Sequence, residues 1–184
     1  MSKIHLVTHN HNKLLEFREL LSIDIDIIDL DIEEIQALDV EKVAIAKAQF
    51  AYNATGKFVI VEDTGLYIEA WNGLPGALTR WFLEALGVQG ICNALRMERN
   101  RKCYIKTALV ACDLNVLETF ISNLDGEILF EPRGKYGFGF DAIIQPMGYQ
   151  KSIAEFNPRE KNVLSTRKKV VEQFEQYVKR SNIS

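Results

Sequence analysis

The organisation of this chain is clearest in the segment Phe58-Val59-Ile60-Val61-Glu62-Asp63-Thr64-Gly65-Leu66. Its first four residues are apolar and mostly β-branched, which predicts a buried β-strand. The strand then brings two adjacent carboxylates, Glu62 and Asp63, to a predicted turn at Gly65. A carboxylate that is buried without a partner is costly, so such a pair requires a nearby cation or a turn that it can cap. Taken alone, the segment is equally consistent with a strand that ends in an ordinary acidic turn.

Strands and helices alternate in the sequence before this segment. Apolar residues at helical spacing predict two helices, and apolar runs between them predict strands. The order β-α-β-α-β favours an α/β sheet with parallel members. The predicted elements are strands at 3–8, Ile25–Leu30 and Phe58–Val61, and helices from about Lys13 and from about Val40 to Ala54.

Beyond Gly65 the pattern changes to shorter, mixed elements. We predict a strand at Leu66–Ala70, helices at Thr79–Leu86 and Gly90–Asn100, a hairpin of Tyr104–Cys112 with Leu117–Asn123, a short strand near Glu127 and a last helix at Ser165–Lys179. The whole chain, residues 1–184, is predicted to be a single α/β domain. Its mixed central β-sheet is flanked by helices, and the domain is elongated into two lobes with a central cleft.

Composition excludes several classes of protein. The formal charge of −3 argues against a general nucleic-acid coat, which carries a broad basic surface. Three cysteines without a Cys-x-x-Cys pair indicate neither a disulfide framework nor a zinc knuckle. The N-terminus has no signal-peptide pattern, and no apolar run approaches membrane-spanning length. We therefore expect a cytoplasmic protein with neither nucleic-acid nor membrane partners.

The loop after the first strand has the features of an anion site. Free backbone amides and the positive end of a helix dipole favour an anion there, and Lys13 adds a charge. A plain polar loop remains the alternative. The sequence is not a Walker loop, and three histidines near it do not form a convincing zinc site. The candidate residues are Thr8, His9, Asn10, His11, Asn12 and Lys13.

A glycine-rich segment, Gly137-Phe138-Gly139-Phe140-Asp141, matches a dinucleotide fingerprint by letter only. It does not open a helix and lies outside a β-α-β unit, so we reject that interpretation. Flexible glycines that place two phenylalanines are suited to stacking on a planar base. Two core phenylalanines on a glycine bend are the alternative.

A second acidic pair, Glu33-Glu34, could join Asp63 in holding Mg²⁺, which prefers a few carboxylates and leaves positions for water and phosphate. A solvated acidic loop is equally consistent with the local sequence. Lys47, Arg80 and Lys161 are uninformative by themselves.

Taken together and in order, these segments resemble the inosine triphosphate pyrophosphatase family, which hydrolyses deaminated purine nucleotides. The resemblance spans nearly the whole chain. The matching segments are Thr8-His9-Asn10-x-x-Lys13-x-x-Glu16, Glu62-Asp63-Thr64-Gly65-Leu66, Asn72-Gly73-Leu74-Pro75-Gly76, Gly137-Phe138-Gly139-Phe140-Asp141, Ala154-Glu155 and Glu160-Lys161-Asn162-x-x-Ser165-x-Arg167.

The resemblance implies a role for each matching residue. The Thr8–Lys13 loop would cradle the triphosphate. Glu34, less favourably Glu33, would bind Mg²⁺ with Asp63, which is also the implied proton acceptor, and Glu62 would support them. Phosphate oxygens or the sugar would be held by Lys47, Thr64 and Arg80, and the base by Phe138, Gly139, Phe140, Asp141, Lys161, Ser165, Thr166 and Arg167.

The implied activity is hydrolysis of ITP, dITP or XTP to the monophosphate and pyrophosphate, by Mg²⁺-assisted attack of water on the α-phosphorus in a homodimer. Two positions depart from the family pattern. Thr166 stands where the family has His, which puts the base preference in doubt, and Leu78 stands where an aromatic is common. The alternatives are a nucleotide-binding sensor without turnover, and a related pyrophosphatase with shifted base specificity.

Overall fold

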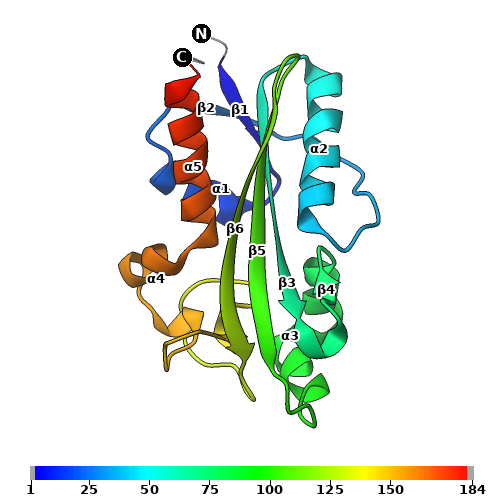
Figure 1. Cartoon of the computed structure of the whole chain (residues 1–184), viewed down its shortest axis with the longest axis vertical. Coiled ribbons are helices and arrows are strands. Elements are labelled where there is room, and N and C mark those ends of the chain that lie inside the picture. The colour runs from blue at the N-terminus through cyan, green and yellow to red at the C-terminus, as the bar shows by residue number, and fades with distance from the viewer. Residues whose placement is uncertain (1–2, 182–184) are drawn as a thin grey trace. The chain divides into compact units, whose positions relative to one another are not determined.

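A mixed β-sheet of seven strands runs through this computed structural model, which describes residues 3–181. The strand order is β2-β1-β3-β5-β6-β7, and β4 pairs with β3 beside this path (Figure 1). The predicted α/β class with a mixed sheet is therefore confirmed. The strands are β1 (Ile4–Val7), β2 (Ile25–Ile28), β3 (Val59–Ile68), β4 (Pro75–Gly76), β5 (Lys102–Cys112), β6 (Leu117–Ile128) and β7 (Ile144–Pro146). The α-helices are α1 (His11–Leu20), α2 (Val40–Thr55), α3 (Thr79–Ala94), α4 (Pro158–Leu164) and α5 (Thr166–Arg180), and short 3-10 turns are η1 (Glu69–Trp71), η2 (Asp141–Ile143) and η3 (Ile153–Glu155).

The chain divides into two compact units. Of the described residues, 3–63, 107–122 and 167–181 form the first unit, and 64–106 and 123–166 form the second unit. Strands β3, β5 and β6 contribute residues to both units. This division agrees with the predicted two lobes, whereas the elongated shape, the central cleft and the single-domain boundary stay predictions.

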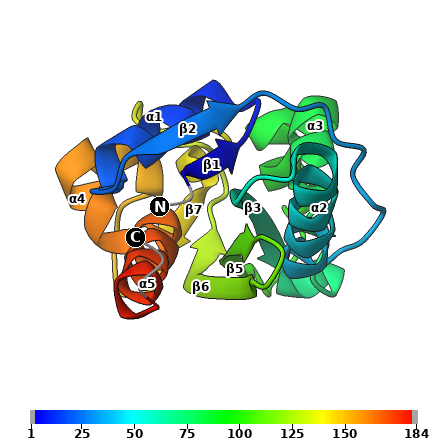
Figure 2. The ribbon, with the colours of Figure 1, turned by 90° about the horizontal axis from the view of Figure 1, so that it is seen from above.

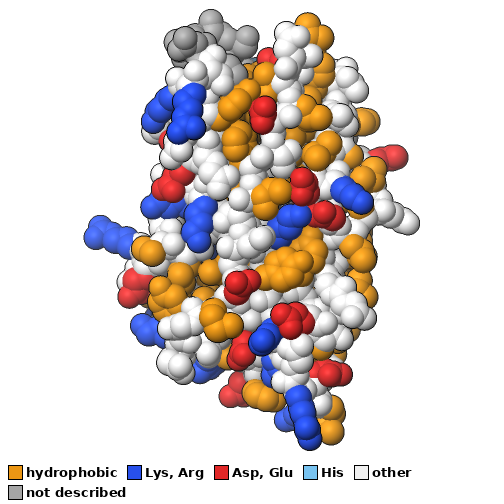
Figure 3. All heavy atoms as spheres, viewed as in Figure 1, with side chains coloured by type: hydrophobic (Ala, Val, Ile, Leu, Met, Phe, Trp, Pro, Cys, Tyr) orange, Lys and Arg blue, Asp and Glu red, His pale blue; other side chains and the backbone are white. Residues whose placement is uncertain are grey.

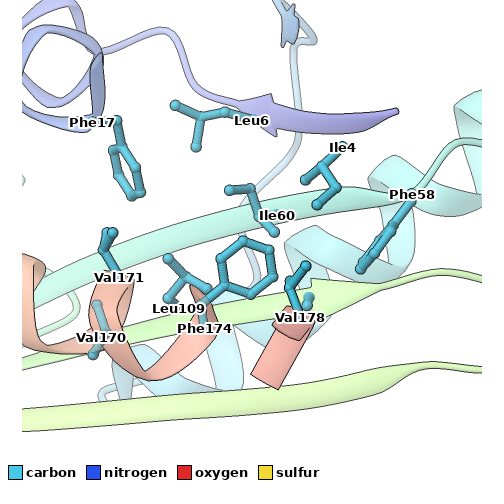
Figure 4. Close-up of a cluster of buried hydrophobic side chains, with 11 residues drawn as sticks. Ile4, Leu6, Phe17, Phe58, Ile60, Leu109, Val170, Val171, Phe174 and Val178 are labelled. Atoms are coloured by element: carbon cyan, nitrogen blue, oxygen red, sulfur yellow. The ribbon is translucent and has the colours of Figure 1, made fainter. Parts of the chain in front are cut away.

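In the first unit, β1 pairs in parallel with both β2 and β3. Alternate residues of β1, such as Ile4 and Leu6, point to one face of the sheet, because side chains alternate along a strand. Helices α1 and α5 cover that face, and α2 lies on the opposite face (Figure 2). The core between the sheet and helices α1 and α5 is drawn in Figure 4. It contains Ile4, Leu6, Phe17, Phe58, Ile60, Leu109, Ala111, Val170, Val171, Phe174 and Val178.

The second unit has a separate apolar core. β4 and β7 pair antiparallel with β3 and β6, respectively. Helix α3 is kinked at Gly87, whose φ of 64° and ψ of 173° are not helical. The buried core residues are Leu66, Ile68, Ile91, Cys92, Leu95, Cys103, Ile105, Ile128, Ile143, Ile144 and Ile153.

The predicted turn at Gly65 is wrong, because β3 continues without interruption from Val59 to Ile68. The strand at Leu66–Ala70 is thus the end of β3, and the strand near Glu127 is likewise the end of β6. The sequence predicted that the adjacent carboxylates would require either a nearby cation or a turn that they could cap. They find cationic partners within the first unit instead, so the strand can pass through them.

Two helix boundaries differ from the prediction, and one helix was missed. Helix α1 begins at His11 rather than Lys13, because the Asn10 side chain accepts hydrogen bonds from the amides of the first turn. The helix predicted to reach Asn100 ends at Ala94, and the Arg101 guanidinium donates a hydrogen bond to the Leu95 carbonyl. Helix α4 was not predicted. It begins with Pro158 after an Asn157 capping box, a typical helix start.

Across residues 3–181, no helix combines the length and the apolar character needed to cross a membrane. On the face seen in Figure 3, acidic and basic side chains are intermingled, and Lys and Arg do not gather into one broad patch.

Candidate functional site

The loop between β1 and α1 places Lys13 in the first turn of α1. The Asn10 side chain accepts hydrogen bonds from the amides of Asn12 and Lys13, at 3.0 and 3.1 Å, and the Thr8 hydroxyl accepts one from the Asn10 amide. These amides were predicted to be free for an anion, and in this structure the loop itself occupies them. These hydrogen bonds stabilise the loop, and they thereby position the backbone of Lys13.

Lys13 reaches the acidic pair on β3. Its ammonium donates to the Glu62 carbonyl oxygen at 3.0 Å, lies 3.1 Å from Glu62 Oε2, and lies 3.6 Å from Asp63 Oδ1. The topology explains this meeting. β1 and β3 are parallel neighbours whose last paired residues are Val7 and Val61, so the loop that follows β1 begins beside Glu62 and Asp63, which are still within β3.

Arg167, in the first turn of α5, occupies the other side of Glu62. Its Nε and Nη2 donate to the Glu62 carboxylate at 3.3 Å, and its Nη1 contacts Glu16 on α1. Burial alone lowers the pKa of this guanidinium, but the charges of Glu62 and Glu16 raise it above its usual value. The Arg167 guanidinium is therefore charged, and both members of the ion pair are buried, with the Glu62 side chain only 1% exposed.

The surroundings of Asp63 disfavour the charged form of its carboxyl group. Burial raises the pKa of its carboxyl group, Lys13 and Lys47 counteract this, and the negative charges of Glu62 and Glu34 raise it further. Lys47, on α2, is in turn 2.7 Å from Glu34. Glu34 is thus the member of the Glu33-Glu34 pair that is coupled to both Asp63 and Lys47.

The donor chemistry around Asp63 fits a magnesium ion. A divalent cation would relieve both the burial of the Asp63 carboxylate and its repulsion by Glu34 and Glu62. Within residues 3–181 no three His, Cys, Asp or Glu side chains are gathered closely enough to enclose a metal. Mg²⁺ commonly uses one or two carboxylates and completes its shell with water and phosphate oxygens.

A second cluster lies in the second unit, at the glycine-rich segment. The Asp141 carboxylate accepts hydrogen bonds from the Phe138 amide at 3.0 Å and from the Lys161 ammonium at 2.9 Å. The same ammonium lies 5.0 Å from the centroid of the Phe138 ring. Phe140 instead packs against the core of the second unit, which favours the core interpretation for that phenylalanine. The segment therefore presents one partly buried aromatic ring, one ammonium and one carboxylate together.

The remaining candidates are distributed over both units. His9 contacts the Leu30 carbonyl and the Asp29 carboxylate, and His11 opens α1. Arg80 is on the exposed side of α3, 2.8 Å from Glu84. Thr64 lies within β3, Ser165 ends α4, and Thr166 is buried at the start of α5. Whether these residues and Gly139 touch a substrate stays a prediction.

The structure adds Glu16 to the residues that the sequence argument singled out. Glu16 belongs to a matching segment but had been given no role, and here its carboxylate contacts Arg167. Its spacing from Lys13 is a usable signal, because residues three apart share a helix face. Its partner, more than a hundred positions away, has no such local signal.

Charged side chains gathered where a strand of a parallel pair ends are typical of the ligand sites of α/β proteins, and the cluster beside the end of β1 has this arrangement. Residues 4–177 match the Ham1 family, and the chain belongs to that family. It is 35% identical to the dITP/XTP pyrophosphatase of Pyrobaculum aerophilum, over 98% of each chain, and 33% identical to the inosine triphosphate pyrophosphatase of Saccharomyces cerevisiae, over 96% of each. The solved structure of a HAM1 protein from Coxiella burnetii is similar, with a TM-score of 0.87 and 30% identity over 98% of this chain and 100% of that one. The family resemblance inferred from the sequence motifs is confirmed.

Proposed function

We propose that this chain hydrolyses non-canonical purine nucleoside triphosphates, namely ITP, dITP and XTP, to the monophosphate and pyrophosphate. The observation that carries the proposal is the cluster of Lys13, Glu62, Asp63, Lys47 and Glu34 in the first unit of a Ham1-family chain. Phosphoryl transfer depends mainly on positioning and on neutralising charge. The buried Asp63 carboxylate acts as a general base, and the ammonium groups of Lys13 and Lys47 lie near it. Together they supply the positioning and the charge neutralisation.

Asp63 is the proton acceptor in this proposal. Water attacks the α-phosphorus, its proton passes to the Asp63 carboxylate, and the bond between the α-phosphorus and the bridging oxygen of pyrophosphate breaks. A carboxylate whose pKa is raised is a stronger base than an ordinary one, which supports this role. Lys13 and Lys47 offset negative charge on the polyphosphate, while their present pairing with carboxylates keeps them in place.

Magnesium belongs to the same proposal. Asp63 and Glu34 would hold the ion, and when bound it neutralises phosphate charge and acidifies water. The carboxylates then have two tasks, because they bind a cation and also orient the ammonium groups that face the phosphates.

Recognition of the base is assigned to residues of the second unit. The Phe138 ring offers a stacking surface, and the hydrogen-bonded pair of Lys161 and Asp141 offers polar groups. Thr166 replaces the imidazole that is usual in the family, so a shifted base preference is the second candidate function. The homodimer, the cytoplasmic location and the lack of nucleic-acid or membrane partners rest on the family resemblance and composition alone.

A turnover panel tests the proposal. Purified protein with Mg²⁺ is offered the triphosphates of inosine, xanthosine, adenosine, guanosine and the pyrimidines, and pyrophosphate, orthophosphate and monophosphate are each quantified. We expect pyrophosphate and monophosphate in equal amounts, with inosine and xanthosine nucleotides hydrolysed fastest.

Each other outcome has a defined meaning. Orthophosphate as the first product would place cleavage at the terminal phosphate and contradict the proposed attack. Fastest turnover of a common nucleotide would support the shifted specificity. Binding of inosine triphosphate without turnover would support the sensor.

A further inference from the structure

The buried ion pairs of Arg167 call for an explanation other than contact with a base. The residue lies in the first turn of α5, where the positive end of the helix dipole disfavours a cation. The Arg167 side chain is nevertheless only 9% exposed to solvent. Such a placement is tolerated only when strong partners offset both costs.

Those partners use every nitrogen of the guanidinium. Nε and Nη2 donate to Glu62, and Nη1 contacts Glu16. Glu62 Oε2 is shared, since it accepts from Arg167 Nε at 3.3 Å and lies 3.1 Å from the Lys13 ammonium. Arg167 thus fixes the orientation of the Glu62 carboxylate from one side. On its other side, the Glu62 carboxylate fixes the position of the Lys13 ammonium.

Rigid elements hold both ends of this chain of contacts. Phe17 of α1 and Val170 and Phe174 of α5 belong to the same buried core. Glu16 precedes Phe17, and Arg167 lies one helical turn before Val170, so the backbone beneath both charged side chains is anchored. Four carboxylates, of Glu16, Glu34, Glu62 and Asp63, face three cations, of Lys13, Lys47 and Arg167.

We propose that Arg167, braced by Glu16, is a positioning residue that acts through Glu62 to keep the Lys13 ammonium beside Asp63. This inference rests on the proposed function for its catalytic consequence, and it replaces the base contact that the family resemblance implied for Arg167. If Arg167 contacts the base, its replacement should change the hydrolysis rate by different factors for nucleotides with different bases. A positioning role affects the shared polyphosphate chemistry, and therefore all nucleotides alike.

The test compares Arg167→Met, Arg167→Lys and Glu16→Gln with Arg18→Met, a matched control on the exposed side of α1. For Arg167→Met we expect kcat to fall about 100-fold, by the same factor for inosine, xanthosine and guanosine triphosphates, because small misplacements of catalytic groups cost that much. Glu16→Gln should give a smaller loss of the same kind. Arg167→Lys should recover part of kcat, and Arg18→Met should match the wild type.

A second readout does not require turnover. Lys13 has a side-chain exposure of 16%, so acylation by an N-hydroxysuccinimide ester, followed by mass spectrometry, reports how firmly it is held. Without nucleotide, we expect Lys13 to be acylated several-fold faster in Arg167→Met and Glu16→Gln, with exposed Lys42 as the internal reference. Should Arg167→Met not fold, Arg167→Lys and Glu16→Gln carry the same comparison.

Two results would overturn the inference. One is a loss that differs more than about tenfold between bases while kcat for the best substrate is kept, since each tenfold step is about 1.4 kcal/mol of differential contact. The other is unchanged Lys13 acylation in folded variants. If the wild type hydrolyses none of the nucleotides, the proposed function fails, whereas faster acylation would still support the positioning of Lys13.

Discussion

At the residue scale, the cluster around Asp63 keeps carboxylates closer together than stability alone favours. Glu62 is well compensated, because Arg167 and Lys13 both contact it. The Lys13 ammonium lies 3.6 Å from the Asp63 carboxylate, farther than it lies from Glu62. The pKa of the Asp63 carboxyl is raised by burial in spite of Lys13 and Lys47. A group held in this way is suited to accept a proton or a metal ion.

The raised pKa of Asp63 predicts how stability depends on pH. The folded state binds the Asp63 proton more tightly than the unfolded state, so stability from this group is fully present below the ordinary value of 3.8 and is lost as pH rises through the raised value. Without divalent ions, Asp63→Asn should therefore gain stability relative to the wild type as pH increases from about 3.5 to 7. Each unit of pKa shift corresponds to about 1.4 kcal/mol.

Urea unfolding at several pH values, with a chelator present, measures this difference in unfolding free energy. Asp24→Asn, at an exposed position of the same unit, is the matched control and should show no such trend. An Asp63→Asn variant that loses stability relative to the wild type at pH 7 would show that the native carboxylate is better compensated than we infer.

The glycine-rich turn shows what sequence reasoning could reach at the element scale. The pattern indicated that glycines place aromatic side chains, and Gly137 does have a φ of +77°. A Cβ atom at this position would lie 2.1 Å from Asp141 Oδ2, the oxygen that accepts from the Phe138 amide and from Lys161. Glycine is therefore needed both for the backbone and for the close approach of Asp141.

Gly137→Ala is predicted to break this arrangement. The strained backbone costs about 1–3 kcal/mol, and displacement of Asp141 also disrupts its hydrogen bonds to Phe138 and Lys161. Gly56→Ala is the control, because Gly56 also has a positive φ, of +64°, but no atom lies within 4 Å of the added Cβ. We expect Gly137→Ala to unfold at lower temperature than Gly56→Ala and to raise KM for the nucleotide. Equal melting temperatures and an unchanged KM would contradict this account of the turn.

Strand β3 shows where local reasoning stops. Its apolar residues predicted the strand correctly, and its acidic pair lies beside Lys13, but the turn at Gly65 was wrong. Glu62 is stabilised by Lys13, 49 positions earlier, and by Arg167, 105 positions later. Short-range patterns contain no information on such pairings. The motif order supplied it only through the family resemblance.

At the scale of the whole molecule, the residues proposed to bind phosphate and metal belong to one unit, and the residues proposed to recognise the base belong to the other. Lys13, Lys47, Glu34 and Asp63 are in the first unit, and Phe138, Asp141 and Lys161 are in the second. The alternation of strands and helices predicted a sheet with parallel members, and β1 does pair in parallel with β2 and β3. The boundaries of the second unit were harder to predict, because three of its strands, β3, β5 and β6, are shared with the first unit.

The most direct measurement of the central claim is pyrophosphate release by Asp63→Asn from inosine triphosphate with Mg²⁺. Its fold is to be verified by melting, and Asp24→Asn serves as the control. We predict a folded variant whose kcat is at least about 100-fold below the wild type, since general-base catalysis contributes about that much or more. A rate close to that of the wild type would contradict the assignment of Asp63 as the proton acceptor.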